Sequence, residues 1–148
     1  MLTPGKKKRS LFSLPGIVLL LGMLLPHTVM GKESALVTAN NPVEKLSKRE
    51  LRRLLLGKTK QWRNGDKVVL ATLRGGVAHS QFIEAYVGKT AKQFTNYWRK
   101  MLFSGKGRMP KAFRSQRELA SFVANHKGAL GYTSEGLLFN GTKVLIIE

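Results

Sequence analysis

A nearly continuous apolar run at residues 67–73, KVVLATL, constrains the fold of this chain more than any other stretch. A strand that is apolar on both faces needs cover on both faces, which helices provide when they pack on either side of a sheet. Helical patterns precede this run and follow it, so strands and helices alternate along the chain. The sequence therefore predicts an α/β domain with a helix-covered mixed β-sheet.

Three capping boxes predict where helices begin: S-x-x-E from Ser47, T-x-x-Q from Thr90 and S-x-x-E from Ser115. A further helix is expected from about Ala78 to Val87. Glycines at 57 and 88 are expected to end two of these helices. The predicted core contains Leu51, Leu54, Leu55, Phe94, Tyr97, Trp98, Met101, Leu102, Leu119, Phe122 and Val123, which recur at helical spacing. Further strands are expected after Ser34, at residues 129–132 (ALGY) and at residues 143–148 (KVLIIE).

The N-terminus has the layout of a secretory signal peptide. A basic segment, KKKRS, precedes the apolar run LFSLPGIVLLLGMLL, and small residues near Gly31 suit a cleavage site. We expect residues 1–31 to be removed and residues 32–148 to form one exported, periplasmic domain; an uncleaved membrane anchor is the alternative. The 26 Lys and Arg residues include four within residues 6–9, so 22 remain against 8 acids, a net charge of +14 on the mature domain.

Several kinds of catalytic site lack their residues. The chain has no cysteine, which excludes a disulfide, a thiol nucleophile and a cysteine zinc site. In the mature part, His79 and His126 are far apart in sequence and lack the spacing of a zinc motif. The acidic residues are scattered singly, and no G-x-S-x-G or Walker motif is present. We therefore expect a protein that is not an enzyme and that needs no metal or cofactor.

The turn after the apolar strand is the best candidate binding site. Residues 73–82 read LRGGVAHSQF, which is a strand end, two glycines and a helix start. Backbone amides at a helix N-terminus hold anions, and Arg74 can donate paired hydrogen bonds to a phosphate or carboxylate. The expected ligand-binding residues are Arg74, Gly75, Gly76, Val77, Ala78, His79 and Ser80. A glycine in such a place is also common for packing alone.

The order of several motifs resembles the substrate-binding protein of phosphate ABC transporters. LSKRELRRLLLGKTKQW is similar to that family's LSxxELxxIFxGKxxxW, SGKGR to its GKG loop, and KGALGY to its GxIGY strand. The resemblance covers about residues 35–147. It implies one three-layer lobe of a periplasmic-binding-protein-like fold, phosphate or a similar oxyanion as ligand, and a transporter permease or another envelope protein as partner.

The binding turn departs from that family's pattern, Arg-x-x-x-Ser-Gly-Thr. Aligning the helices that follow places Val77, Ala78 and His79 where Ser-Gly-Thr is expected, and Arg74 one position late. Ser80 is the nearest substitute for the missing hydroxyls. The backbone amides of the turn survive these substitutions, but the side-chain hydroxyls that select the ligand do not. The resemblance therefore implies the fold more directly than it implies the ligand.

A second hypothesis comes from the charge. The domain is also interpretable as a basic envelope module that docks on an anionic polymer, lipid or protein through Arg49, Arg52 and Arg53 of the first helix. Nucleic acid is a less favoured partner, because an exported domain works outside the cytoplasm.

Overall fold

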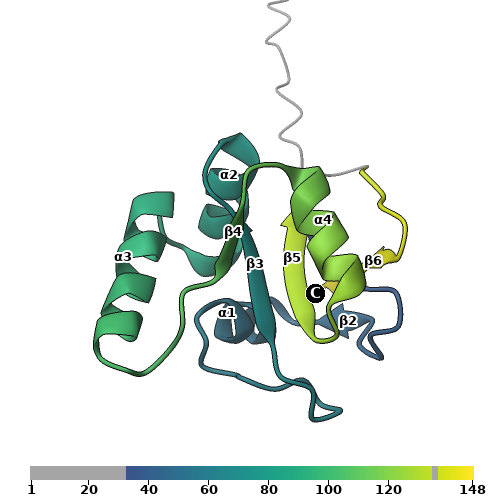
Figure 1. Ribbon diagram of the computed structural model, residues 1–148, viewed down its shortest axis with the longest axis horizontal. Helices are drawn as coiled ribbons and strands as arrows, with labels where there is room; N and C mark the ends of the chain where they lie inside the picture. Colours follow the sequence, from purple (N-terminus) through teal and green to yellow (C-terminus); the bar gives the residue numbers. More distant parts are fainter. Residues whose placement is uncertain (1–32, 135–136) are drawn as a thin grey trace, which may run out of the picture.

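The computed structural model describes residues 33–134 and 137–148, and it has helices on both faces of a mixed sheet (Figure 1). The predicted signal peptide and its cleavage site lie outside these residues. The elements in chain order are β1 (Ser34–Thr38), β2 (Lys45–Leu46), α1 (Lys48–Leu55), β3 (Val69–Leu73), α2 (Val77–Val87), α3 (Ala91–Phe103), β4 (Lys111–Phe113), α4 (Gln116–Asn125), β5 (Ala129–Thr133), β6 (Thr142–Val144) and β7 (Ile146–Ile147).

The main sheet has the strand order β4-β3-β5-β1-β6. Strands β4, β3 and β5 run parallel, and β1 is antiparallel to both β5 and β6. A separate parallel pair joins β2 to β7. The predicted buried strand is β3, which lies between β4 and β5 and is buried over residues 70–73. The predicted fold class, a mixed sheet in an α/β domain, is confirmed.

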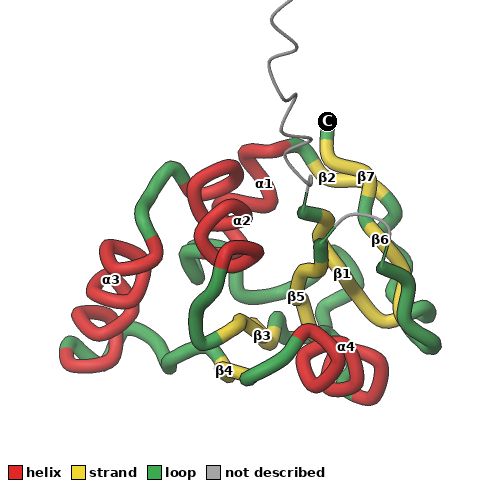
Figure 2. Tube along the Cα trace, turned by 90° about the horizontal axis from the view of Figure 1, so that it is seen from above, coloured by secondary structure: helices red, strands yellow, loops and turns green. Residues whose placement is uncertain are grey.

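Helices cover the sheet from two sides. Helix α4 packs across β5, β1, β3 and β4 on one face, and α1 and α2 lie on the other (Figure 2). Helix α3 packs against α2 at the β4 side of the sheet. The close approach of α4 depends on Gly131 of β5, where a Cβ would lie 2.5 Å from Cδ2 of Leu119 and 2.9 Å from Cγ2 of Val123. Over the described residues, no helix is long and apolar enough to span a bilayer.

The capping boxes fix two helix starts as predicted. Ser47 and Thr90 each accept a hydrogen bond from the backbone at N3, and the N3 side chain bonds back. At Ser115 only half of the box forms, because the carboxylate of Glu118 accepts from the backbone N–H of Arg114 instead. The third helix start was therefore right, but its capping box was not.

Other expectations were only partly right. Leu102 was placed in the core but is 45% exposed, because α3 packs on the molecule only along a narrow stripe. The C-terminal run forms two short strands, β6 and β7, rather than one. Strands β2 and β4 were not predicted; they have two and three residues and exist through pairing with distant segments. Trp62 covers the core as expected, is 5% exposed, and donates from Nε1 to the carbonyl of Gly128 at 2.9 Å.

Candidate functional site

The predicted turn lies where the parallel strands end. Strands β3, β4 and β5 point the same way, so their carboxyl ends share one edge of the sheet, and α2 and α4 both begin there (Figure 1). The backbone N–H of Arg74 donates to the carbonyl of Phe113 at 2.9 Å, which ties the start of the turn to the end of β4. Crevices outside the carboxyl ends of strands are common ligand sites in α/β sheets.

Gly76 gives the turn its shape. It is the N-cap of α2 and has φ 93° and ψ 174°, a backbone conformation that only glycine adopts readily. A Cβ placed at Gly75 or Gly76 would meet nothing within 4 Å. The two glycines are therefore not there for packing; at Gly76 the backbone conformation is the reason.

The N-terminus of α2 has no cap of its own, which distinguishes it from the other helices. Helices α1, α3 and α4 have N-cap side chains that accept a hydrogen bond from the first turn, whereas Gly76 offers no side chain. The first N–H groups of a helix have no partner within it. Within residues 33–134 and 137–148, the backbone N–H groups of residues 75–79 have no acceptor. The first turn of α2 also lacks an acidic side chain, so these amides remain available to an anion.

The turn is also open to solvent. Arg74, Gly75, Gly76 and Val77 are all exposed, and Val77 is 72% exposed. The guanidinium of Arg74 makes no hydrogen bond or ion pair within the described part of the chain. A cation and a group of amides without acceptors thus lie together on one exposed surface.

The side chain of His79 turns away from this surface. It is 4% exposed, and its Nδ1 lies 2.5 Å from the hydroxyl of Tyr132 on β5. That hydroxyl accepts from the backbone N–H of Leu73 at 2.8 Å, which leaves its own proton free for His79 Nδ1. In this arrangement the ring proton of a neutral His79 is on Nε2. Burial lowers the pKa of His79 and raises that of Tyr132, which keeps both groups neutral.

We call Tyr132, His79 and the Leu73 amide the tyrosine clamp. The clamp joins the last residue of β3 and the first turn of α2 to the same hydroxyl on β5. The ends of the turn are thereby fixed relative to each other. Of His79, only the backbone amide remains for a ligand, whereas its side chain positions the turn.

Ser80 is partly used by the helix itself. Its hydroxyl donates to the carbonyl of Gly76 at 3.2 Å, a bond back to the preceding turn. The hydroxyl would have to rotate to donate to an anion.

Arg114 was not among the predicted site residues. It follows β4 directly and lies beside Arg74, because Leu73 pairs with Phe113 in the parallel strands β3 and β4. Only the strand pairing reveals this second cation; no local signal in the sequence does.

The described residues contain no cluster of metal ligands, since no three His, Asp or Glu side chains gather there. The pKa of Glu50 is lowered to about 2 by its hydrogen bonds with the backbone and side chain of Ser47 and by Arg63. This shift reflects the role of Glu50 in capping α1.

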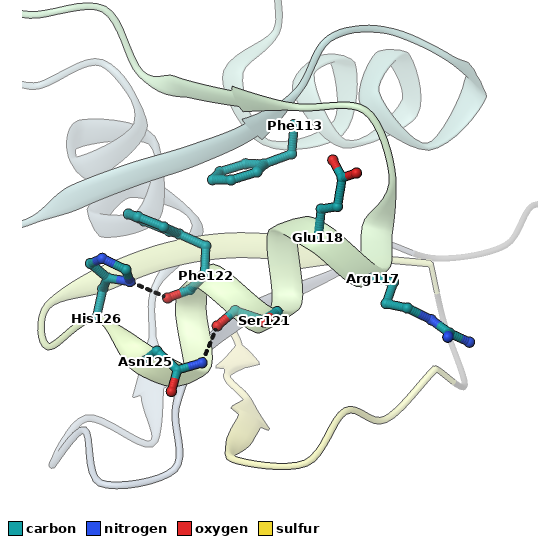
Figure 3. Close-up of a pocket in the computed structure, with 7 residues that line it drawn as sticks. All are labelled: Phe113, Arg117, Glu118, Ser121, Phe122, Asn125 and His126. Atoms are coloured by element: carbon teal, nitrogen blue, oxygen red, sulfur yellow. Dashed lines mark hydrogen bonds between the residues drawn. The ribbon is translucent and has the colours of Figure 1, made fainter.

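A hollow between α4 and β4 is shallow and open, with a volume of about 630 Å³ (Figure 3). Figure 3 shows its floor, where the ring of His126 stacks on Phe122 with centroids 3.8 Å apart and Nδ1 donates to the carbonyl of Phe122 at 2.8 Å. Phe113 lies against the other side of Phe122, and Arg117 points away. Asn125 Nδ2 and His126 Nδ1 both donate to backbone carbonyls of α4, and the carboxylate of Glu118 repels anions, so the hollow is a less suitable anion site than the turn.

No protein-family model and no characterised protein sequence matches the chain. Solved structures do. An ABC-type phosphate transport receptor from Vibrio cholerae has a TM-score of 0.61 at 15% identity, over 79% of this chain and 46% of the receptor. A phosphate ABC transporter substrate-binding protein from Clostridium perfringens, with bound phosphate, gives 0.62 at 16% identity, over 79% and 45%. PstS from Borrelia burgdorferi gives 0.62 at 13%, over 80% and 47%.

These likenesses establish the fold. The chain has a periplasmic-binding-protein-like architecture and spans less than half the length of the three receptors that it matches.

Proposed function

We propose that this chain, on the fold that it shares with phosphate receptors, binds phosphate or a similar oxyanion without catalysing a reaction. The uncapped N-terminus of α2 is the observation that carries the proposal. Its amides from Gly75 to His79 lack acceptors in the described part of the chain, and Arg74 lies beside them. Similar folds that hold phosphate, such as the Clostridium perfringens protein, support this reading.

The amides and the guanidinium have separate tasks in this site. Amides that converge at a helix start offer fixed donors to the oxygens of a tetrahedral anion. Arg74 adds charge and a second pair of donors, and Ser80 adds a hydroxyl once it releases the carbonyl of Gly76. The tyrosine clamp holds the turn in place from below. Because the turn is exposed, a bound anion keeps part of its hydration, and we expect weak affinity unless a partner covers it.

Equilibrium dialysis with radiolabelled phosphate at low salt tests the proposal. We expect saturable retention that weakens about fivefold in Arg74→Gln, the loss of roughly one exposed charge-assisted contact. Arg49→Gln is the matched control, because this exposed arginine on α1 carries the same charge away from the turn. Equal weakening in both variants would mean that net charge alone attracts the ion. No retention up to millimolar phosphate would refute binding.

We also propose that the chain works outside the cytoplasm as part of a phosphate uptake system, with a transporter permease or another envelope protein as partner. Its basic leader and apolar run at residues 1–31 support export. N-terminal sequencing of the exported protein should begin at Lys32. A chain that keeps residue 1 and stays with the membrane would instead support the uncleaved anchor.

A further inference from the structure

The C-terminal end of α3 presents apolar side chains to solvent. Phe103 is 85% exposed and Leu102 is 45% exposed. Neither belongs to the proposed anion site. The chain turns tightly after them, because the backbone N–H of Gly105 donates to the carbonyl of Leu102 and that of Lys106 to the carbonyl of Met101. Leu102 and Phe103 are therefore both exposed at the end of α3, at the outer edge of the molecule (Figure 1).

Cations surround these two side chains. Arg99 lies three residues before Leu102 and four before Phe103, and Lys100 lies three before Phe103, the spacings at which helix side chains are neighbours. Lys106 and Arg108 follow in the loop and are exposed. The salt bridges within residues 33–134 and 137–148 involve none of these four cations. We call Arg99, Lys100, Leu102, Phe103, Lys106 and Arg108 the α3 corner.

The sequence keeps acids away from the α3 corner. Residues 85–117 contain nine Lys and Arg residues and no Asp or Glu. An ordinary solvated surface mixes the two signs. Here an apolar tip is combined with charge of one sign, and that combination is what an anionic bilayer surface binds: the apolar groups enter the headgroup region while the cations meet the lipid phosphates.

We propose that the α3 corner docks this protein on an anionic lipid surface. Leu102 and Phe103 line neither of the two hollows of the described chain and so can meet a flat surface, whereas binding a nucleic-acid strand calls for a groove with exposed rings. The adjoining groove of about 1150 Å³ has cations along its walls, Lys106 and Arg108 of the corner among them, but the rings of Trp62 and Trp98 in it are only 5% and 4% exposed. That groove offers no surface on which bases could stack.

Docking at the α3 corner leaves the anion turn free. The loop after α3 leads into the amino end of β4, whereas the turn at residues 74–76 lies at the carboxyl ends of β3 and β4 (Figure 1). The two surfaces therefore lie toward opposite ends of the parallel strands. A chain held on a membrane by the α3 corner would still present its anion turn to the solution. The proposed lipid contact therefore does not depend on whether the turn binds phosphate.

A tryptophan reporter tests the proposal in the full chain. In Phe103→Trp, we expect the emission of the introduced indole to shift to shorter wavelength with vesicles of phosphatidylcholine and phosphatidylglycerol in equal parts, and to be quenched when the acyl chains are brominated. Vesicles of phosphatidylcholine alone should do neither. Leu138→Trp is the matched control, since this side chain is 83% exposed but lies outside the corner. Because all variants share residues 1–31, the Leu138→Trp control also reports any membrane contact that this segment makes.

Charge variants complete the test. Each basic residue near an anionic surface contributes roughly fivefold to binding, so Arg99→Gln with Lys100→Gln should lower the ratio of docked to undocked reporter roughly thirtyfold. Arg49→Gln with Arg52→Gln on α1 should leave that ratio unchanged. The proposal is overturned if anionic vesicles do not quench the reporter, if neutral vesicles quench it equally, or if both charge pairs act alike. Quenching by single-stranded DNA but not by vesicles would also overturn it.

Discussion

Replacing Gly76 by alanine separates the conformational role of this residue from every packing effect. A Cβ at this position would meet no atom within 4 Å, so the substitution creates no clash. The cost comes from the backbone, which holds φ 93° and ψ 174°. Gly75 is the matched control, because it also has open space around it but no positive φ.

The magnitude follows from these angles. Holding a non-glycine residue in this backbone region costs about 1–3 kcal/mol. Alanine also lowers the conformational entropy of the unfolded chain relative to glycine, which offsets about 0.4–1 kcal/mol of that cost. We therefore expect Gly76→Ala to lower the free energy of unfolding by about 1–2 kcal/mol. Gly75→Ala should leave it unchanged or raise it by up to about 1 kcal/mol.

Urea unfolding followed by circular dichroism measures both variants. Gly76→Ala should also weaken phosphate binding, because a relaxed turn no longer directs the amides of Gly76 and Val77 together. The conformational role of Gly76 would be contradicted if Gly76→Ala were as stable as the parent chain, or if Gly75→Ala lost as much stability. Either result would mean that the backbone of the turn is not held in the glycine-only conformation.

Three further predictions concern the support of the site. Tyr132→Phe should lower the free energy of unfolding by about 2–4 kcal/mol in urea, since it leaves the Leu73 amide and His79 Nδ1 without partners; an unchanged midpoint would rule out the tyrosine clamp. Burial lowers the pKa of His79 below its usual 6.5, so in this pH range the unfolded chain binds more protons than the folded chain. The free energy of unfolding should therefore fall as the pH drops from 6.5 toward the pKa of the folded state, and urea unfolding of His79→Gln should show a smaller fall. Gly131→Ala should cost about 1–3 kcal/mol, because its Cβ would lie 2.5 Å from Leu119 Cδ2, and thermal unfolding unaffected by it would contradict the close packing of α4.

The parts of the fold that local chemistry determines were readable from the sequence. Ser47 and Thr90 start helices because their side chains cap them, and the apolar run at residues 67–73 is buried from residue 70 onward because helices cover both faces of the sheet. Strand β4 was not predicted, because its three residues carry no local strand pattern and become a strand only by pairing with β3. Leu102 shares the spacing of the buried stripe, yet spacing alone does not show how wide the contact of a helix is.

The candidate site divides in the same way. The glycines and Arg74 form one local segment, so the turn and its position before a helix were predicted. Tyr132 lies 59 residues from Leu73 in sequence and 53 from His79, and nothing local indicates that its hydroxyl joins them. For the same reason the side chain of His79 looked like a donor to a ligand, whereas the structure places it in the core.

An NMR titration of the ¹⁵N-labelled chain with phosphate shows whether the N-terminus of α2 binds the anion, because it reports on each backbone amide separately. We expect saturable shifts for the amides of residues 75–79, with no comparable shifts when chloride replaces phosphate at equal ionic strength. Shifts confined to α1 and its arginines, or shifts that grow linearly without saturation, would contradict a site at the N-terminus of α2.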